Sequence, residues 1–496
     1  MSKRKFAEFR RTLGMALAVA ATGSVLLLGC TSDSSVARVF GSAGQGPAAA
    51  ATKGPDYDKF RKTFIEATND DGTREQQLRH FNDAFLRVRR DYVHDVVQPE
   101  LLTSAIAGIQ EAKGEQKSIS PKDATEGALD TMLASLDPHS IYLNPEEYSE
   151  SQVVTSGQFG GLGIEINAEN GVIKVIAPIA DTPAEKAGIK SGDLIISVDG
   201  TDIRGMKLTE AVRLLRGAPG TAVMLRMTRD GVPDFDVKVT RAIIQIEPVK
   251  WAVDGNYGYI NVTQFISRAE EAMERAMRRI RAELGPNLKG IVLDLRNNPG
   301  GLLTQSVEIA DAFLNDGKIV SVRDRQGETR RFDASPGDIA RGLPMVVLIN
   351  RGSASASEIV AGALQDHHRA IVLGVRSFGK GSVQVITPLD WGGALRLTTS
   401  LYYLPSGRTI QGRGVLPDIG VTGPDETDAK READLPHALM AGEVTEDGRP
   451  RATLDESQCP VAGTKKDDRL LGCALMYLQS GSPEKFLASM STRPKS

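Results

Sequence analysis

The feature that most constrains the fold is an alternation of short apolar runs with amphipathic stretches from residue 259 onward. Three runs have the length and composition of buried strands: 291–295, 345–349 and 370–373. Three amphipathic stretches predict the intervening helices: 273–284, 303–314 and 357–364. Such alternation requires crossover connections, so the sequence predicts an α/β core. Alternating residues at 383–386 and the run 395–404 add further strands and make the expected sheet mixed.

Two other patterns precede this core. Between residues 76 and 109, apolar side chains recur at three- and four-residue steps, which predicts an amphipathic helix. A polar stretch at 111–122 interrupts the pattern, and a second helix is expected at 124–136. Residues 157–240 hold short apolar strands with glycine turns and one helix at 208–215, which is typical of a small compact domain.

The chain of 496 residues is therefore predicted to be an α/β multidomain protein. Its expected segments are a signal peptide (1–30), a flexible linker (31–75), an N-terminal helical region (76–155), a small domain of strands with one or two helices (156–242), the α/β core (243–422) and a C-terminal extension (423–496). The extension is polar and patchy, which predicts a poorly structured tail with one short helical stretch near 470–478.

Charge and histidine placement argue against two classes of function. The formal net charge is -3, and Lys and Arg are spread along the chain, whereas a nucleic-acid-binding domain needs a basic patch or stripe. None of the six histidines has metal-ligand spacing with a cysteine or another histidine. We therefore expect no nucleic-acid partner, no metal and no cofactor.

The N-terminus has the charge and length of a secretory signal. Several basic residues precede an apolar run at 13–28, which is too short for a comfortable membrane span. The run ends in Leu27-Leu28-Gly29-Cys30, which resembles a bacterial lipobox, whose cysteine is lipidated and becomes the mature N-terminus. This implies a lipid-anchored protein on the periplasmic side of a bacterial cell envelope, with inner and outer membrane both open. The alternative is a plain signal peptide with a chance cysteine at position 30.

Two more cysteines, Cys459 and Cys473, lie in the C-terminal extension, far from the segments described next. In an oxidising periplasm they could pair. Two interpretations of these cysteines stay open, a structural disulfide and two free thiols without a function, and either is favoured over a catalytic role.

A serine-rich segment follows the apolar run 345–349. It reads Asn-Arg-Gly-Ser-Ala-Ser-Ala-Ser-Glu at 350–358, where a glycine turn leads from a buried strand into a helix. A nucleophilic Ser355 at that junction would gain from the helix N-terminus, whose free N–H groups stabilise negative charge. The alternative is that these serines only cap the helix, and this segment alone does not exclude it.

A lysine between two glycines stands in a second segment, Ser-Phe-Gly-Lys-Gly-Ser-Val-Gln at 377–384. Lys380 acts as a general base only when it is neutral, so its pKa must be lowered by burial or by a nearby cation. It would then take the proton of Ser355 and return it to the leaving amine, while Gln384 orients it. The alternative is a solvated loop lysine.

The same stretch also matches the first positions of a phosphate-binding P-loop, from residue 374 to Lys380. The next position must be Ser or Thr to hold Mg²⁺, and here it is Gly381. A strand pattern follows in place of the P-loop helix. Nucleotide binding is therefore not expected.

A third segment, Asp-Leu-Arg-Asn-Asn-Pro-Gly-Gly at 294–301, is another strand end followed by a glycine pair. Free backbone N–H groups in such a turn are good donors to an oxyanion. The alternative is a tight turn without further function.

Together the three segments resemble the carboxyl-terminal processing peptidases, or tail-specific proteases, of serine peptidase family S41. The family hallmark is Ser-Ala-Ser-Ala-Ser-Glu followed by Phe-Gly-Lys-Gly-x-Val-Gln, and both stand intact here at 353–358 and 378–384. The resemblance implies that Ser355 is the nucleophile, Lys380 its base and Gln384 an assistant of the lysine.

The resemblance also implies an oxyanion hole made by the backbone N–H groups of Ala356 and Gly301. Two interpretations of Glu358 stay open: it is a supporting acid near the site, or it is a packing residue. The similarity extends over roughly residues 76–422 and includes the segment 135–143, Ser-Leu-Asp-Pro-His-Ser-Ile-Tyr-Leu. The insert at 111–122 and the cysteine-bearing tail depart from the family, and no function is carried onto them.

The small domain resembles a PDZ domain. The sequence Gly-Gly-Leu-Gly-Ile at 160–164 looks like a PDZ carboxylate-binding loop, which implies Gly161, Leu162, Gly163 and Ile164 as peptide-binding residues. Gly-Ile-Lys-Ser-Gly-Asp-Leu-Ile at 188–195 looks like a PDZ turn and strand. A PDZ groove binds an extended peptide end as an added strand. The alternative for the loop is a plain hairpin.

These observations predict an exported serine endopeptidase that acts on envelope proteins with a Ser–Lys dyad. Its PDZ domain would recognise exposed C-termini of substrates and gate the site. Two alternatives stay open: a PDZ scaffold whose peptidase fold is inactive, and a peptidase that is silent without an adaptor lipoprotein. Homo-oligomer formation and the physiological substrate are left open by the sequence.

Overall fold

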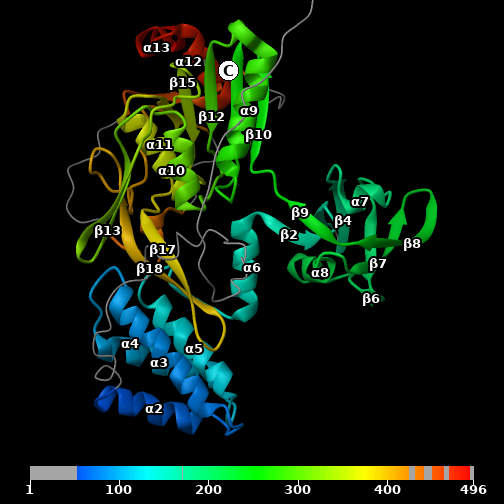
Figure 1. Cartoon of the computed structure of the whole chain (residues 1–496), viewed down its shortest axis with the longest axis vertical. Helices are drawn as coiled ribbons and strands as arrows, with labels where there is room; N and C mark the ends of the chain where they lie inside the picture. The colour runs from blue at the N-terminus through cyan, green and yellow to red at the C-terminus, as the bar shows by residue number, and fades with distance from the viewer. Residues whose placement is uncertain (1–52, 170, 424–429, 441–449, 463–467, 492–496) are drawn as a thin grey trace, which may run out of the picture. The chain divides into compact units, whose positions relative to one another are not determined.

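The computed structural model describes residues 53–169, 171–423, 430–440, 450–462 and 468–491 (Figure 1). The chain begins there with a unit of four helices packed on one another: α2 (Pro55–Ala67), α3 (Arg74–Asp91), α4 (Gln98–Lys113) and α5 (Pro121–Ala134). Stacked aromatic rings lie at its centre, with the Phe60 and Phe81 centroids 4.1 Å apart. The predicted N-terminal helical region is thus observed.

Two details of this unit differ from expectation. The linker predicted for 31–75 is too long, because α2 lies inside it at Pro55–Ala67 and buries Phe60 and Phe64 completely. The single helix expected over 76–109 is two helices, since α3 ends at Asp91 and Pro99 starts α4 afresh in its first turn. The first difference arises because α2 is stabilised by its tertiary neighbours, which a local pattern does not contain. The second follows from Pro99, which favours the start of a new helix.

The small domain is built from a six-stranded antiparallel sheet. Its order is β3-β4-β5-β7-β8, with β6 paired to β5. The strands and helices are β3 (Ile164–Glu169), β4 (Val172–Pro178), α7 (Pro183–Lys186), β5 (Leu194–Val198), β6 (Thr201–Asp202), α8 (Leu208–Leu215), β7 (Ala222–Arg229) and β8 (Val232–Thr240). The chain enters through β2 (Gln158–Gly161) and leaves through β9 (Ala242–Gln245), which pair with each other.

The core is a seven-stranded sheet in the order β10-β11-β12-β15-β16-β19-β20. All neighbours are parallel except the first pair, so the expected mixed α/β sheet is confirmed. The strands are β10 (Val249–Asp254), β11 (Tyr257–Val262), β12 (Gly290–Asp294), β15 (Met345–Ile349), β16 (Ile371–Gly374), β19 (Ile419–Thr422) and β20 (Ala452–Asp455).

Helices cover this sheet on its two faces. One hydrophobic cluster joins it to α9 (Ala269–Leu284), α10 (Leu303–Asp311) and α11 (Ala356–Asp366). A separate cluster joins the opposite face to α12 (Arg469–Ser480) and α13 (Pro483–Ser491); α12 packs on β15, and α13 packs on α12 (Figure 1). Because both faces are covered, strands such as β12 and β15 are buried along their whole length.

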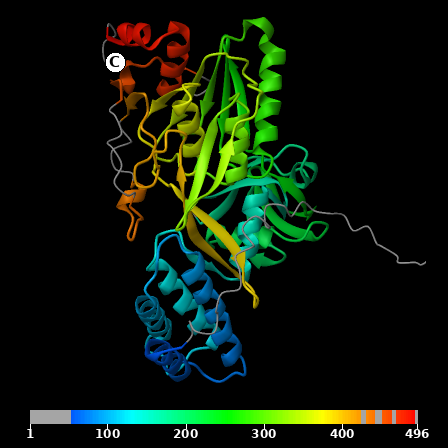
Figure 2. The same ribbon diagram turned by 60° about the vertical axis from the view of Figure 1, so that its left-hand side comes forward.

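A second, five-stranded sheet joins the core to the helical unit. It contains β1 (Ile141–Leu143), β13 (Lys318–Asp324), β14 (Gly327–Asp333), β17 (Ser382–Pro388) and β18 (Ala394–Tyr403). Figure 2 shows the long β17–β18 hairpin running to the helices. Leu389, Leu395 and Leu397 of the hairpin are buried in the hydrophobic core of the helical unit.

The C-terminal extension contains more regular structure than the sequence predicted. Its described parts include β20, α12 and α13, so the helix expected near 470–478 is present. Cys459 and Cys473 form a disulfide, with Cα atoms 5.0 Å apart, which settles the two alternatives in favour of a bridge. The apolar face of α12 packs on the sheet, and this distant partner explains why the tail looked patchy when considered alone.

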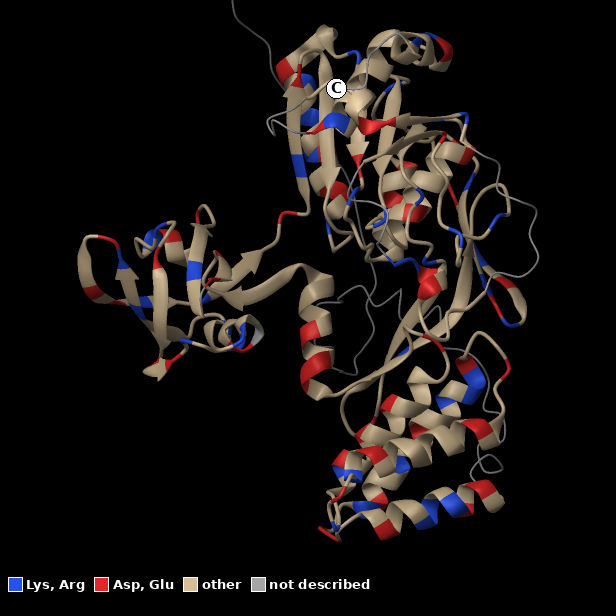
Figure 3. Cartoon of the chain, turned by 180° about the vertical axis from the view of Figure 1, so that it is seen from behind, with Lys and Arg blue, Asp and Glu red and all other residues tan. Residues whose placement is uncertain are grey.

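Charged residues of both signs are scattered over the ribbon of the described segments (Figure 3). This distribution agrees with the small net charge of -3. In the part of the chain that the structure describes, no helix is both long and apolar enough to cross a membrane.

Candidate functional site

Ser355 lies where the chain passes from β15 into α11. It is the residue that precedes the helix, and its backbone has φ 54° and ψ -112°. A non-glycine residue at positive φ is strained and persists only where the surrounding structure enforces it. Here Ser353 fixes the preceding turn: its hydroxyl accepts from the N–H of Asn350 at 3.0 Å and donates to the carbonyl of Leu295 at 2.8 Å.

Two backbone N–H groups beside Ser355 have no acceptor among the described residues. They belong to Ala356, the first residue of α11, and to Gly301, the two residues predicted to form an oxyanion hole. Gly300 brings the two segments together: a side chain there would come within 2.9 Å of the Ser355 Cβ and 3.1 Å of the Ala356 nitrogen. Only glycine permits this approach.

Asn298 ties the glycine turn to the serine loop. Its side chain is fully buried, donates to the carbonyl of Val262 at 2.8 Å and accepts from the N–H of Gly300 at 2.9 Å. Its own carbonyl accepts from the N–H of Ala354 at 3.0 Å and from the hydroxyl of Ser357 at 2.8 Å. The positions of the two free N–H groups are therefore fixed relative to each other.

Lys380 lies in the loop between β16 and β17 and is partly buried. Burial lowers the pKa of Lys380, and the guanidinium of Arg396 on β18 lowers it further. The carboxylates of Glu432, Asp137 and Glu358 act against these two effects. Within the described ranges, the ammonium nitrogen makes no hydrogen bond or ion pair. These surroundings favour the neutral amine that a general base requires.

Glu358 joins the serine and lysine loops. One of its carboxylate oxygens, Oε2, accepts from the backbone N–H of Ser355 at 2.7 Å and from that of Lys380 at 2.9 Å. The other, Oε1, accepts from the hydroxyl of Ser377 at 2.5 Å and the N–H of Gly379 at 2.7 Å. Glu358 is fully buried, and burial raises its pKa to about 7 although all four hydrogen bonds lower it. Of the two interpretations left open, the supporting acid agrees with these contacts.

Gln384 lies on β17, close to the hairpin partner strand. Its amide nitrogen donates to the hydroxyl of Ser382 at 2.9 Å and to that of Thr398 at 3.1 Å. No hydrogen bond joins Gln384 to Lys380 in the described structure, so the orienting contact expected between them is not made here.

Two further residues act on the lysine, Asp137 and Glu432, and a third, His139, contacts Glu432; the sequence assigned no role to any of them. Asp137 is buried in the loop after α5, and His139 of the same loop contacts Glu432 with its Nε2 at 2.8 Å from the carboxylate. Glu432 comes from the C-terminal extension and is fully buried. Asp137 and His139 belong to the segment 135–143, which resembles the family but to which no function was assigned from the sequence. Glu432 carried no local signal, because its burial depends on the return of a distant part of the chain.

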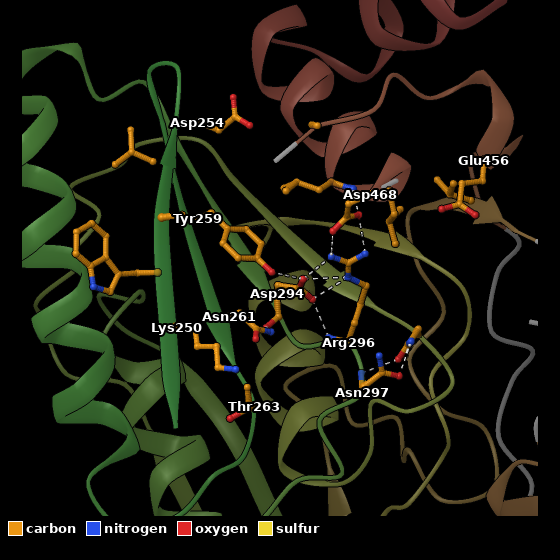
Figure 4. Close-up of a pocket in the computed structure, with 18 of the residues that line it drawn as sticks. Lys250, Asp254, Tyr259, Asn261, Thr263, Asp294, Arg296, Asn297, Glu456 and Asp468 are labelled. Atoms are coloured by element: carbon orange, nitrogen blue, oxygen red, sulfur yellow. Dashed lines mark hydrogen bonds and ion pairs between the residues drawn. The ribbon is translucent and has the colours of Figure 1, made fainter. Parts of the chain in front are cut away.

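A second network lies behind the glycine turn (Figure 4). Arg296 makes paired hydrogen bonds to Asp294 at the end of β12 and to Asp468 at the start of α12, the latter at 2.8 and 2.9 Å. The hydroxyl of Tyr259 donates to the same Asp294 at 2.8 Å. These residues line a cavity of about 860 Å³ that extends to Asn297 beside the turn. The C-terminal extension thus contacts the segment that bears Gly301, one of the two predicted oxyanion donors.

The loop predicted to bind peptide carboxylates lies between β2 and β3. Leu162 is almost fully buried, and Gly163 has φ 79°. The backbone N–H groups of Leu162 and Gly163 have no acceptor among the described residues, whereas their carbonyls accept from Ala184 and Ile179. Gly161 and Ile164 belong to the flanking strands. Free N–H groups in a loop held by its carbonyls suit a peptide carboxylate.

The predicted lipidation residue, Cys30, lies outside the described residues. Within the described ranges, no group of three or more His, Cys, Asp or Glu side chains is arranged to hold a metal ion.

Comparison with known proteins identifies two sequence families in this chain. The profile of peptidase family S41 matches residues 256–421, and that of the PDZ domain matches residues 174–229. These matches lie inside the ranges predicted for the core and the small domain.

Three similar proteins illustrate the likeness. The carboxy-terminal-processing protease of Bartonella bacilliformis is 48% identical over 360 residues, which is 72% of this chain and 78% of that protein. The carboxyl-terminal-processing protease of Synechocystis sp. is 38% identical over 313 residues, 61% of this chain and 72% of that protein. Among solved structures, the photosystem II D1 C-terminal processing protease is 31% identical, covers 70% of this chain and 92% of its own, and has a TM-score of 0.44.

Proposed function

The chain belongs to peptidase family S41 as a serine-type carboxyl-terminal processing protease with a PDZ domain, and we propose that it cleaves with a dyad of Ser355 and Lys380. One observation carries the proposal. A single buried oxygen of Glu358 accepts from the backbone N–H groups of both residues, at 2.7 and 2.9 Å. The serine and the lysine are therefore held next to each other, although they come from different loops.

In the first half of the proposed reaction, the neutral amine of Lys380 takes the proton of Ser355 as the serine Oγ attacks the scissile carbonyl carbon. The carbonyl oxygen becomes an oxyanion, to which the N–H groups of Ala356 and Gly301 donate. The lysine then gives its proton to the nitrogen of the leaving peptide. The C–N bond breaks, and an acyl ester on Ser355 remains.

In the second half, a water molecule attacks this ester. Lys380 takes a proton from the water and returns it to the serine Oγ, so the ester bond breaks and the new C-terminus leaves. The lysine starts and ends the cycle neutral, which is supported by the burial and the Arg396 charge that lower its pKa.

We further propose that the PDZ domain captures exposed C-termini of substrates and gates access to Ser355. The free N–H groups of Leu162 and Gly163 support the capture step, because backbone donors in this kind of loop bind a terminal carboxylate. A substrate whose terminal carboxylate is amidated would lose that contact.

The proposed location is the periplasmic side of a bacterial cell envelope, with a lipid anchor on Cys30. The basic and apolar N-terminal segment supports export. The Cys459–Cys473 disulfide supports an oxidising compartment. We expect the full chain in the membrane fraction and a Cys30→Ala variant in the soluble fraction after cell lysis. A Cys30→Ala variant that stays in the membrane fraction would contradict the lipid anchor.

Cleavage of an unfolded protein by the purified full chain tests the central proposal, with the Ser355→Ala variant as the blank. We expect the chain alone to release fragments, more slowly when the substrate C-terminus is amidated. Activity that appears only after addition of envelope extract would support the adaptor-dependent alternative. Tight peptide binding without any cleavage, with or without extract, would support the inactive scaffold. A Ser355→Ala protein that cleaves normally would overturn the dyad.

Capture identifies the substrates. The Ser355→Ala variant, produced in the cell envelope where the chain normally acts, retains substrates that it cannot cleave. We expect the retained proteins to be exported ones with exposed C-termini. A retained set made up of cytoplasmic proteins would contradict the proposed location.

A further inference from the structure

A chain of three side chains leads from Gln384 into the helical unit. The amide nitrogen of Gln384 lies 3.1 Å from the Thr398 hydroxyl, which lies 2.9 Å from a carboxylate oxygen of Asp137. Thr398 is fully buried on β18, and Asp137 is 1% exposed in the loop between α5 and β1. Asp137 and Thr398, which come from two distant parts of the sequence, are thus linked by hydrogen bonds to Gln384, the predicted assistant of the proposed dyad.

The direction of these hydrogen bonds follows from counting protons. Asp137 is surrounded by donors: the hydroxyls of Thr398 and Ser140, at 2.9 and 2.5 Å, and the N–H groups of His139 and Ser140, at 2.9 and 3.0 Å. A carboxylate only accepts. The single hydroxyl proton of Thr398 therefore points to Asp137, and towards Gln384 the threonine offers only a lone pair.

This fixes the orientation of the Gln384 carboxamide, which coordinates alone do not determine. Its NH₂ group must face Thr398, and its second proton is directed to the Ser382 hydroxyl at 2.9 Å. The amide oxygen consequently points away from both hydroxyls. Among the described residues it accepts no hydrogen bond, and the ammonium nitrogen of Lys380, four residues earlier, donates none.

We propose that Asp137 and Thr398 are positioning residues of the peptidase: they hold the Gln384 carboxamide so that its oxygen is presented to the amine of Lys380. The inference rests on the proposed function. Once the Gln384 oxygen accepts an N–H of Lys380, the lone pair of the neutral lysine is free to take the Ser355 proton. The helical unit therefore contributes to the reaction through Asp137, in addition to its packing against the hairpin.

A purely electrostatic role of Asp137 is the competing explanation, since its charge also acts on Lys380. The two roles separate at Thr398, which carries no charge. Replacement of its hydroxyl keeps the Asp137 carboxylate with its donors from His139 and Ser140, and it removes the contact that orients Gln384.

The test compares Thr398→Val with Thr398→Ser in the full chain. Valine has nearly the shape of threonine, and serine keeps the hydroxyl. We expect Thr398→Val to lower kcat by about 100-fold at unchanged KM, because the catalytic group is then misplaced. Thr398→Ser should keep most of the kcat. In a Gln384→Ala background, Thr398→Val should cost nothing further, since the residue that it positions is gone.

Several results would overturn the inference. They are a wild-type kcat in Thr398→Val, an equal loss in Thr398→Ser, and multiplying losses in the double variant with Gln384→Ala. Thermal unfolding of each variant checks that it is folded, and Thr398→Ala, which cannot overpack the site, replaces valine if that variant unfolds. Ser355→Ala separates the two proposals: an active Ser355→Ala protein refutes the dyad, whereas an active Thr398→Val protein refutes only the positioning role.

Discussion

Ser355→Ala and Lys380→Ala, made singly, are each expected to lower kcat by a factor on the order of 10⁴ to 10⁶, and the double variant is expected to be no worse than either single one. The physical reason is that the two residues act as one unit: without its base the serine is a weak nucleophile, and without the serine the lysine has no proton to take. Peptide cleavage followed by chromatography measures the three rates.

The matched control is Lys289→Ala, which removes an exposed lysine and should leave kcat unchanged. The wild-type pH profile supplies a second check. Because burial and Arg396 lower the pKa of Lys380, kcat/KM should rise with pH along a limb below the ordinary lysine value of about 10.4. Losses that multiply in the double variant would show that Ser355 and Lys380 act independently.

Glu358→Gln is expected to lower kcat by a factor on the order of 10² to 10³ with little change in KM. The carboxylate accepts two hydrogen bonds on each oxygen. Glutamine offers one oxygen and an NH₂ group. In either orientation of the amide, the NH₂ group therefore faces two hydrogen-bond donors whose bonds the carboxylate oxygen had accepted. Either Ser355 and Lys380 lose their shared acceptor, or Ser377 and Gly379 lose theirs. Steady-state kinetics with a chromogenic peptide measures the effect.

Protonation of Glu358 should have the same consequence, because it also places a hydrogen on one of the two oxygens. Burial raises the pKa of this residue to about 7, so the carboxylate is present above that pH and is lost below it. The wild-type kcat should therefore rise through about pH 7, and Glu358→Gln should lack this step. Glu308→Gln, on the partly exposed surface of α10, is the control. An unchanged step near pH 7 in Glu358→Gln would assign it to another group.

The residues of the site were predictable where their signal is local. Ser355 and Gly301 each follow the end of a buried strand, and strand ends in parallel sheets meet at one edge. Lys380 was predictable only together with these neighbours and the family likeness, since a loop lysine alone has no distinctive pattern. The S41 and PDZ assignments and the α/β architecture are confirmed.

What escaped prediction depends on contacts between distant segments. Asp137 lies far ahead of Lys380 in the sequence and Glu432 follows it, yet both carboxylates act on the lysine. Neither segment has a local pattern that predicts this proximity. Helix α2 lies inside the range predicted as linker, and its charged residues outnumber the three aromatic ones that it buries. Asp468 reaches Arg296 across 172 positions, a separation that no local pattern reports.

That last contact forms only after the C-terminal extension has been synthesised. Synthesis runs from the N-terminus, so β12 and the glycine turn emerge long before Asp468 and α12 are available. Until those residues arrive, one face of the sheet stays uncovered and Arg296 lacks one of its two carboxylate partners. The nascent chain therefore carries all the proposed catalytic residues before the second face of its core sheet is covered and before Arg296 has both of its carboxylate partners.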